Sequence, residues 1–287
     1  MTDYLDQVSE FVADTAFDDL PDPAIERARR VITDTIAAIA AGSAEPEVVE
    51  LTTRMATQGG PSSVIGAARR AQPTTAAFLN GTSGTFLELD EGNQFSRGHP
   101  GIHALPSALA VAEDQRASGQ DFLTAIVLGY EIGARIGIAA KILPTMHPHG
   151  TWGTVGSAVA VAKLMGANAG QVRELINIAS TLGLATSRQT MLQGGTVRNS
   201  FAGFSGQMGI MAWDMLESGF TGEADGLSTI WGKVISTEWR PEEMTNELGS
   251  RYEIARNYFK RHACCRYNHG TLDAMDMIDR ECGGLRA

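Results

Sequence analysis

Small and aliphatic residues recur every three or four positions over most of this chain, whereas the alternating pattern of β-strands is rare. The clearest stretch is PDPAIERARRVITDTIAAIAAG, which begins with prolines and ends at Gly42, as helices commonly do. Its apolar positions follow helical spacing: Ile25, Ala28, Ile32, Ile36 and Ile39. The pattern predicts a helix over 21–42 and favours a mainly all-α fold.

Further stretches with the same periodicity are predicted to be helical: 74–89, 105–118, 119–141, 151–166, 168–183 and 199–219. The stretches 105–118 and 119–141 are expected to form a helical hairpin, in which Gly119 ends the first helix. Asn168 is expected to cap the N-terminus of the helix over 168–183. The early stretch SSVIGAARR is the one expected to form β-structure.

The composition changes after about residue 240, where the chain becomes polar and interrupted. We place a boundary near residue 250, which gives a helical domain over 1–250 and a separate region over 251–287. The second region is too short for a core of its own. We therefore expect it to pack on the helical domain or to belong to a second domain that is incomplete here.

The charge and composition exclude several classes of protein. A net charge of −10 argues against a nucleic-acid binder, whose affinity depends on Lys and Arg that neutralise phosphates. From the sequence we expect no apolar stretch that approaches the roughly 18 residues needed to span a bilayer, and the acidic N-terminus is unlike a signal peptide. The three cysteines provide no disulfide framework. We expect a cytoplasmic protein that binds neither nucleic acid nor membrane.

All six histidines lie in or beside predicted loops, close to carboxylates or cations. The segments concerned are LELDEGNQFSRGHPGIHALP, LPTMHPHGTWG and YFKRHACCRYNHGTLDAMD. A single loop histidine is more often solvated than catalytic, and a carboxylate before a helix often serves as a cap. The joint pattern therefore predicts an active site more strongly than any one of these residues does.

Motifs for metals and nucleotides are missing from the sequence. The chain has no HExxH or CxxC spacing, and its glycine runs fit neither the P-loop nor the dinucleotide fingerprint. Adjacent Cys264 and Cys265 cannot easily direct both thiolates at one metal, so we interpret them as packing residues. We expect no cofactor and no metal.

Three segments, in this order, resemble the MmgE/PrpD family: LELDEGN…GHPGIHALPSALAVAE, MHPHGTWGTVGSAVAVAKLMG and KRHACCRYNHGTLDAM. The family includes 2-methylcitrate dehydratase, cis-aconitate decarboxylase and iminodisuccinate epimerase. The resemblance covers essentially the whole chain. Its most specific parts are the HPG segment and the Cys-Arg-x-x-His-x-x-x-Asp segment.

The resemblance implies a large helical domain and a smaller α/β lid domain, in a homodimer, with a cofactor-free active site between the two domains. Chains of the family continue through the lid. The resemblance therefore implies that 251–287 form only the beginning of the lid, and a second chain that supplies the lid is one alternative.

The resemblance also assigns site residues by motif. His99 and His147 are candidates for proton transfer, with Asp90 orienting one of them. The other matched positions are predicted to bind substrate: Glu88, Arg198, Lys260, Arg266 and His269. Arg198 stands where many members have a lysine, which favours carboxylate binding over proton transfer there. His103 and His149 receive no role.

The implied chemistry takes place next to a carboxylate of a small di- or tricarboxylic acid. Dehydration of the 2-methylcitrate type is our first interpretation. Epimerisation of an amino-dicarboxylate such as iminodisuccinate and decarboxylation of the cis-aconitate type are alternatives, because all three reactions pass through related carbanion-like species. A further alternative is a non-catalytic or split-enzyme subunit that needs a lid-bearing partner.

Overall fold

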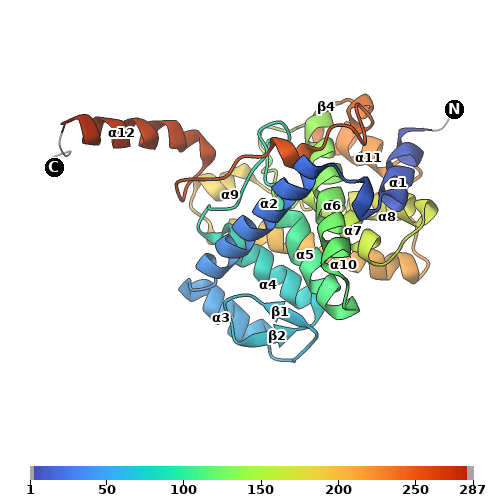
Figure 1. Ribbon diagram of the computed structural model, residues 1–287, viewed down its shortest axis with the longest axis horizontal. Helices are drawn as coiled ribbons and strands as arrows, with labels where there is room; N and C mark the ends of the chain where they lie inside the picture. Colours follow the sequence, from blue (N-terminus) through green and yellow to red (C-terminus); the bar gives the residue numbers. More distant parts are fainter. Residues whose placement is uncertain (1–2, 283–287) are drawn as a thin grey trace.

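The computed structural model describes residues 3–282 and confirms a mainly all-α fold, in which the strands of the described part form short pairs (Figure 1). The α-helices are α1 (Tyr4–Asp14), α2 (Asp22–Gly42), α3 (Pro46–Met55), α4 (Pro73–Phe86), α5 (Pro100–Gln115), α6 (Gly119–Ala139), α7 (Gly153–Leu164), α8 (Ala169–Thr181), α9 (Arg188–Leu192), α10 (Phe201–Glu217), α11 (Gly226–Thr229) and α12 (His269–Cys282). The strands pair as β1 (Ser62–Val64) with β2 (Arg69–Ala71), and β3 (Ala140–Ile142) with β4 (Ser236–Trp239), both antiparallel.

Helix α6 forms the centre of the body, and every residue from Leu123 to Gly137 is buried. Neighbouring helices surround α6, so its sequence is apolar on nearly all sides, except for the buried ion pair of Glu131 with Arg135. By length and composition this helix could cross a membrane, contrary to our expectation from the sequence. However, 89% of its apolar window is buried inside the protein. Packing within the core accounts for the apolar length of α6.

Glycines allow the core helices to pack closely against one another. A Cβ atom on Gly129 of α6 would lie 2.6 Å from the carbonyl oxygen of Gly156 on α7. A Cβ atom on Gly81 of α4 would lie 2.7 Å from the Cα atom of Gly203 on α10. Larger side chains would push these pairs of helices apart, so the small residues fix the positions of the loops that the helices carry.

The helix boundaries confirm most of the predicted elements and correct one. Asn168 caps α8 through its side chain, and the stretch 62–70 contains the β1–β2 hairpin turn. Gly119, however, begins α6 and does not end α5. Helix α5 ends at Gln115 with Arg116 in the left-handed conformation (φ 53°), and Ser118 forms a capping box with Asp121 at the start of α6. The capping box outweighs the preference of glycine for helix ends.

A buried arginine attaches the polar stretch after residue 240 to α6. This stretch contains the 3₁₀ turns η4 (Pro241–Met244) and η5 (Glu253–Arg256). Arg135 is fully buried and donates to the Glu131 carboxylate at 2.7 Å. Its guanidinium also donates to the carbonyl oxygens of Asn246 at 2.8 Å and Arg251 at 3.2 Å. One side chain therefore satisfies backbone acceptors from an otherwise irregular segment.

Replacing Arg135 with methionine should lower the free energy of unfolding by about 3–5 kcal/mol, because the Glu131 carboxylate would remain buried without its partner. Arg30→Met provides a matched control, since Arg30 also pairs with a glutamate one turn earlier, but both side chains are exposed. That control should cost less than about 1 kcal/mol. Urea unfolding of both variants measures the difference, and equal losses would contradict this role of Arg135.

Candidate active site

Four segments of the chain converge beside the ends of α4, α5, α7 and α10. They are the loop from α4 to α5, the loop before α7, the 3₁₀ turn η2 (Thr196–Ser200) before α10, and the extended stretch after η5. Gly92 in the first segment and Tyr258 in the last exchange two backbone hydrogen bonds, of 3.0 and 2.7 Å. This pairing brings residues that are far apart in the sequence into one cluster.

Asp90 lies at the centre of this cluster and is fully buried. Its Oδ1 atom is 3.2 Å from Lys260 Nζ, and its Oδ2 atom is 3.3 Å from His99 Nδ1. Burial alone would raise the pKa of Asp90, but His99, Lys260 and Arg198 outweigh burial and lower this pKa. Asp90 is therefore a charged carboxylate at neutral pH.

The backbone fixes the tautomer of His99. Its Nδ1 atom lies 2.6 Å from the carbonyl oxygen of Glu91, which can only accept a hydrogen bond. A neutral His99 therefore carries its proton on Nδ1 and leaves a free lone pair on Nε2. Burial lowers the pKa of His99, while Asp90 opposes that shift. The imidazole remains 16% exposed, so an incoming molecule can reach it.

His147 is fixed in the opposite tautomer. Its Nδ1 atom accepts a hydrogen bond of 3.1 Å from the backbone N–H of His149, so the neutral ring carries its proton on Nε2. Burial, followed by the charge of Arg198, lowers the pKa of His147 to about 3. At neutral pH this side chain is a hydrogen-bond donor with no charge.

The structure adds His103 and His149 to the cluster, two residues to which the sequence assigned no role. The His149 ring centroid lies 4.8 Å from those of His99 and His147 and 5.1 Å from that of His103. Both nitrogens of each ring are buried, and neither forms a hydrogen bond among the described residues. Such buried groups normally have a partner, so the arrangement leaves several donors and acceptors for a bound molecule or water.

One sequence signal could have identified His103. It follows His99 by four positions at the start of α5, so the two side chains share one face of that helix. Space for the His103 ring comes from Gly153, because a Cβ atom there would lie 2.2 Å from the imidazole. No comparable spacing rule identifies His149, which follows His147 in an irregular loop.

Glu88 links the two cations of the cluster. Its carboxylate forms an ion pair with Arg198 and lies 3.3 Å from Lys260 Nζ. The backbone of Glu88 adopts the left-handed conformation (φ 56°), which is uncommon for a residue with a side chain. Arg198 is further held by the side-chain oxygen of Asn199 at 3.1 Å. Together with Asp90, the charges of these side chains balance to zero.

The two other predicted substrate-binding residues contact side chains outside the cluster around Asp90. Arg266 is exposed, and its guanidinium lies over the ring of Tyr258 at 5.3 Å. His269 packs edge-to-face against His262 at 5.2 Å, and His262 in turn contacts Asp273 at 2.9 Å. Among the described residues, neither Arg266 nor His269 contacts the cluster by a hydrogen bond or a ring contact. The remaining six predicted residues do come together: Glu88, Asp90, His99, His147, Arg198 and Lys260.

Donor atoms of Asp90, His99 and His149 lie within 4.8 Å of one another, which is close enough to hold a metal ion. However, Lys260 Nζ already lies 3.2 Å from Asp90 Oδ1, so a metal ion would have to displace this cation. Because both carboxylates of the cluster, Asp90 and Glu88, are paired with cations, we interpret the cluster as a proton-transfer and anion-binding site.

Glu91 positions the start of α5 and, through its carbonyl, His99. Its fully buried carboxylate accepts hydrogen bonds from Gly101 N at 2.8 Å, Tyr130 Oη at 3.1 Å and Asn257 Nδ2 at 3.2 Å. Burial raises the pKa of Glu91 to about 8 against the opposing effect of these donors. The sequence indicated Glu91 only as an acidic neighbour of Asp90.

Comparison with known proteins supports the resemblance in the sequence. A family model described as the MmgE/PrpD N-terminal domain matches residues 6–240. The cis-aconitate decarboxylase-like protein oryM of Aspergillus oryzae is 29% identical over 96% of this chain and 61% of its own length. A cis-aconitate decarboxylase of Aspergillus terreus is 26% identical over 96% of this chain and 60% of its own. The human cis-aconitate decarboxylase is 32% identical over 56% of this chain and 35% of its own length. The chain thus spans about three fifths of the length of its Aspergillus relatives.

Replacing Glu91 with glutamine should change how stability depends on pH. Because the pKa of Glu91 is higher in the folded state than the usual 4.5, its stabilising contribution is complete below about pH 4.5 and is lost as the pH rises towards about 8. The wild type should therefore lose stability relative to Glu91→Gln between pH 5 and pH 9. Urea unfolding at pH 5 and pH 9 measures the free energy of unfolding of both proteins. An equal change in this free energy for the wild type and Glu91→Gln would contradict the raised pKa.

Proposed function

Because the chain belongs to the MmgE/PrpD family, we propose that it is a lyase that removes CO₂ from a small di- or tricarboxylic acid of the cis-aconitate type. The relatives named above favour this reaction over the dehydration that the sequence suggested first. Dehydration and epimerisation remain alternatives, since they would use the same side chains.

The observation that carries the proposal is the fixed imidazole of His99. Asp90 and the Glu91 carbonyl hold its Nδ1 side at 3.3 and 2.6 Å, and the Nε2 atom remains available for proton transfer. An imidazole held by a carboxylate is a recurring arrangement for acid–base catalysis. His147 adds a neutral donor, which suits hydrogen bonding to a substrate oxygen without delivering a full charge.

A bound polyanion would change the protonation of the cluster. Burial, followed by nearby positive charges, lowers the pKa values of His99, His147 and His149, whereas substrate carboxylates would raise them. In decarboxylation the C–C bond to the leaving carboxylate breaks and its electron pair passes to the substrate. A proton must then be added to the substrate carbon. We assign this proton to His99: the bound carboxylates raise its pKa, Nε2 takes up a proton from water, and Nε2 then donates that proton to the carbon.

Lys260 and Arg198 supply the cations for the substrate carboxylates. In the structure, both cations form ion pairs with the carboxylate of Glu88. A substrate carboxylate at the same position would form the same two ion pairs. Arg198 favours this role because its planar guanidinium matches a carboxylate with two parallel hydrogen bonds. We therefore propose that substrate displaces the Glu88 side chain, which is a different role from the direct substrate contact expected from the sequence.

A second candidate is that the chain acts only with a partner chain. Helix α12 projects from the helical body (Figure 1) and exposes the apolar side chains of Met275, Met277 and Ile278. Exposed apolar side chains on one helix commonly mark an interface. This candidate retains the same cluster but requires further residues from the partner.

The proposal is tested by NMR of the purified chain incubated with cis-aconitate, 2-methylcitrate, citrate and iminodisuccinate. Loss of CO₂ from cis-aconitate would support the decarboxylase. Loss of water or formation of an epimer would replace it with one of the alternatives. A folded chain that converts none of these compounds would favour the partner-dependent candidate.

His99→Gln should reduce turnover of the accepted substrate by at least about a hundredfold while leaving the circular dichroism spectrum unchanged, since a proton-transfer group typically contributes that much. His262→Gln is the matched control, because His262 also contacts an aspartate, Asp273, but lies outside the cluster. Full activity of His99→Gln would remove His99 from the reaction.

Glu88→Gln should tighten binding of a dicarboxylate such as itaconate roughly two- to fivefold, because the ligand no longer competes with a partly buried ion pair. Glu243→Gln breaks a similar pair with Arg240 elsewhere and should leave the affinity unchanged. Isothermal titration calorimetry gives both affinities. Weaker binding by Glu88→Gln would indicate instead that Glu88 contacts the ligand directly.

A further inference from the structure

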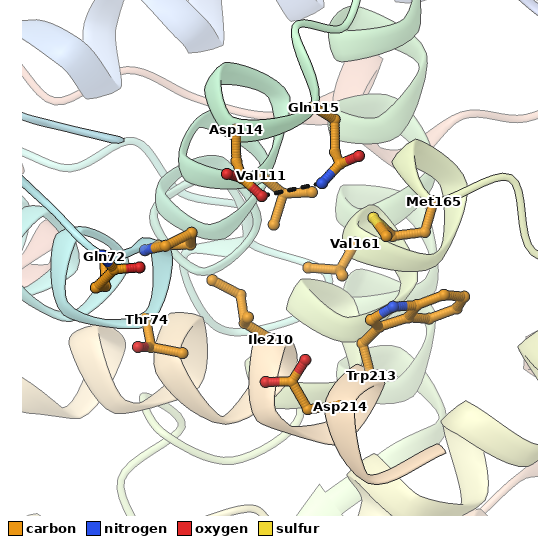
Figure 2. A pocket seen from close by; sticks show the side chains of 11 residues that line it. Gln72, Thr74, Val111, Asp114, Gln115, Val161, Met165, Ile210, Trp213 and Asp214 are labelled. Atoms are coloured by element: carbon orange, nitrogen blue, oxygen red, sulfur yellow. Dashed lines mark hydrogen bonds between the residues drawn. The ribbon is translucent and has the colours of Figure 1, made fainter. Parts of the chain in front are cut away.

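A pocket of about 330 Å³ lies at the far ends of the helices that carry the candidate active site (Figure 2). Helix α5 starts next to His99, and its last residue, Gln115, lines this pocket. Its 16 residues span roughly 24 Å at 1.5 Å per residue, so the two sites are separate. The volume falls at the lower end of the range for small-molecule sites, about 300–1,000 Å³.

The lining of this pocket combines an apolar floor with negative charge. The floor is formed by aliphatic side chains and methionine: Val111, Val161, Met165 and Ile210. Figure 2 shows Asp114 and Asp214 on opposite sides of this floor. The lining residues include no lysine, arginine or histidine. Asp114 accepts a hydrogen bond from the neighbouring Gln115, whereas the Asp214 carboxylate has no side-chain partner among the described residues.

Trp213 provides an unmatched donor at the same place. The side chain lines the pocket and is only 8% exposed, yet its indole N–H forms no hydrogen bond within residues 3–282. In Figure 2 the nitrogen lies on the edge of the ring that faces the other lining residues. This N–H group is therefore available to donate to an acceptor on a molecule that enters the pocket.

We propose that this pocket binds an organic ammonium ion with an aliphatic body and an oxygen acceptor. The ammonium group pairs with Asp214 or Asp114, and the face of Trp213 adds a cation–π contribution. The aliphatic body covers Val161 and Ile210, and the oxygen accepts from the Trp213 indole. Partial burial already raises the pKa of Asp214, and a bound cation would relieve that cost. This site does not depend on the reaction proposed for the histidine cluster.

The test uses 5-aminopentan-1-ol, which carries all three features, and the indole N–H signals of the ¹⁵N-labelled chain. The chain has four tryptophans, so the three others serve as internal references. We expect a saturable shift of one indole signal, which Trp213→Phe identifies by its loss. Pentanoate and 1-pentanol have the same aliphatic body without the cation and should produce at least about tenfold weaker shifts.

Two variants on α10 decide whether the carboxylate binds the cation. Asp214→Asn should weaken binding of 5-aminopentan-1-ol about tenfold. Glu217→Gln removes an exposed carboxylate from the same helix outside the lining and should leave binding unchanged. Equal binding of the three compounds, or full binding by Asp214→Asn, would overturn the proposal. A concentration-dependent shift of the Trp213 signal without ligand would also overturn it, because the face would then be a contact between copies of the chain.

Discussion

The buried guanidinium of Arg135 links the histidine cluster to the helical core. It holds the carbonyl oxygens of the stretch after residue 240 against α6, and the chain then continues from η5 to Tyr258 and Lys260. Together with the hydrogen bond from Asn93 Nδ2 to the Glu253 carbonyl at 3.0 Å, this attachment supports the pairing of Tyr258 with Gly92 and the approach of Lys260 to Asp90. Burying an arginine is costly unless all its donors are satisfied, and here the irregular backbone supplies the acceptors. The irregular segment and the buried charge thus stabilise each other.

The cluster itself combines charged groups in balance with neutral imidazoles. Asp90 and Glu88 offset Lys260 and Arg198, while burial keeps the histidines uncharged. In a dry environment such a balance is easily changed by one additional charge, because little solvent screens it. A ligand with two or three carboxylates would therefore change the protonation of the site as well as occupy it. This property suits chemistry in which one imidazole must change from base to acid.

The helices were largely predictable, because their periodicity is a local property of the sequence. Gly119 shows the limit of single-residue rules, since Ser118 and Asp121 together decided where α6 begins. The site was predictable only in part. Motif resemblance identified Asp90, His99 and Lys260, and the structure brings them together. The ion pair between Glu88 and Arg198 joins side chains far apart in the sequence, and the role of His149 follows from ring packing, so neither had a local signal.

The contact between Asp90 and Lys260 also constrains how the protein is made. These residues are 170 positions apart. At about 5–20 residues per second, a ribosome adds that length in roughly 10–30 s. During this time Asp90 has left the ribosome, but its cation has not been synthesised. Burying an unpaired carboxylate costs several kcal/mol, so we expect the loop from α4 to α5 to stay hydrated in the nascent chain until Lys260 has been synthesised. The helical body can form early, whereas the cluster closes last.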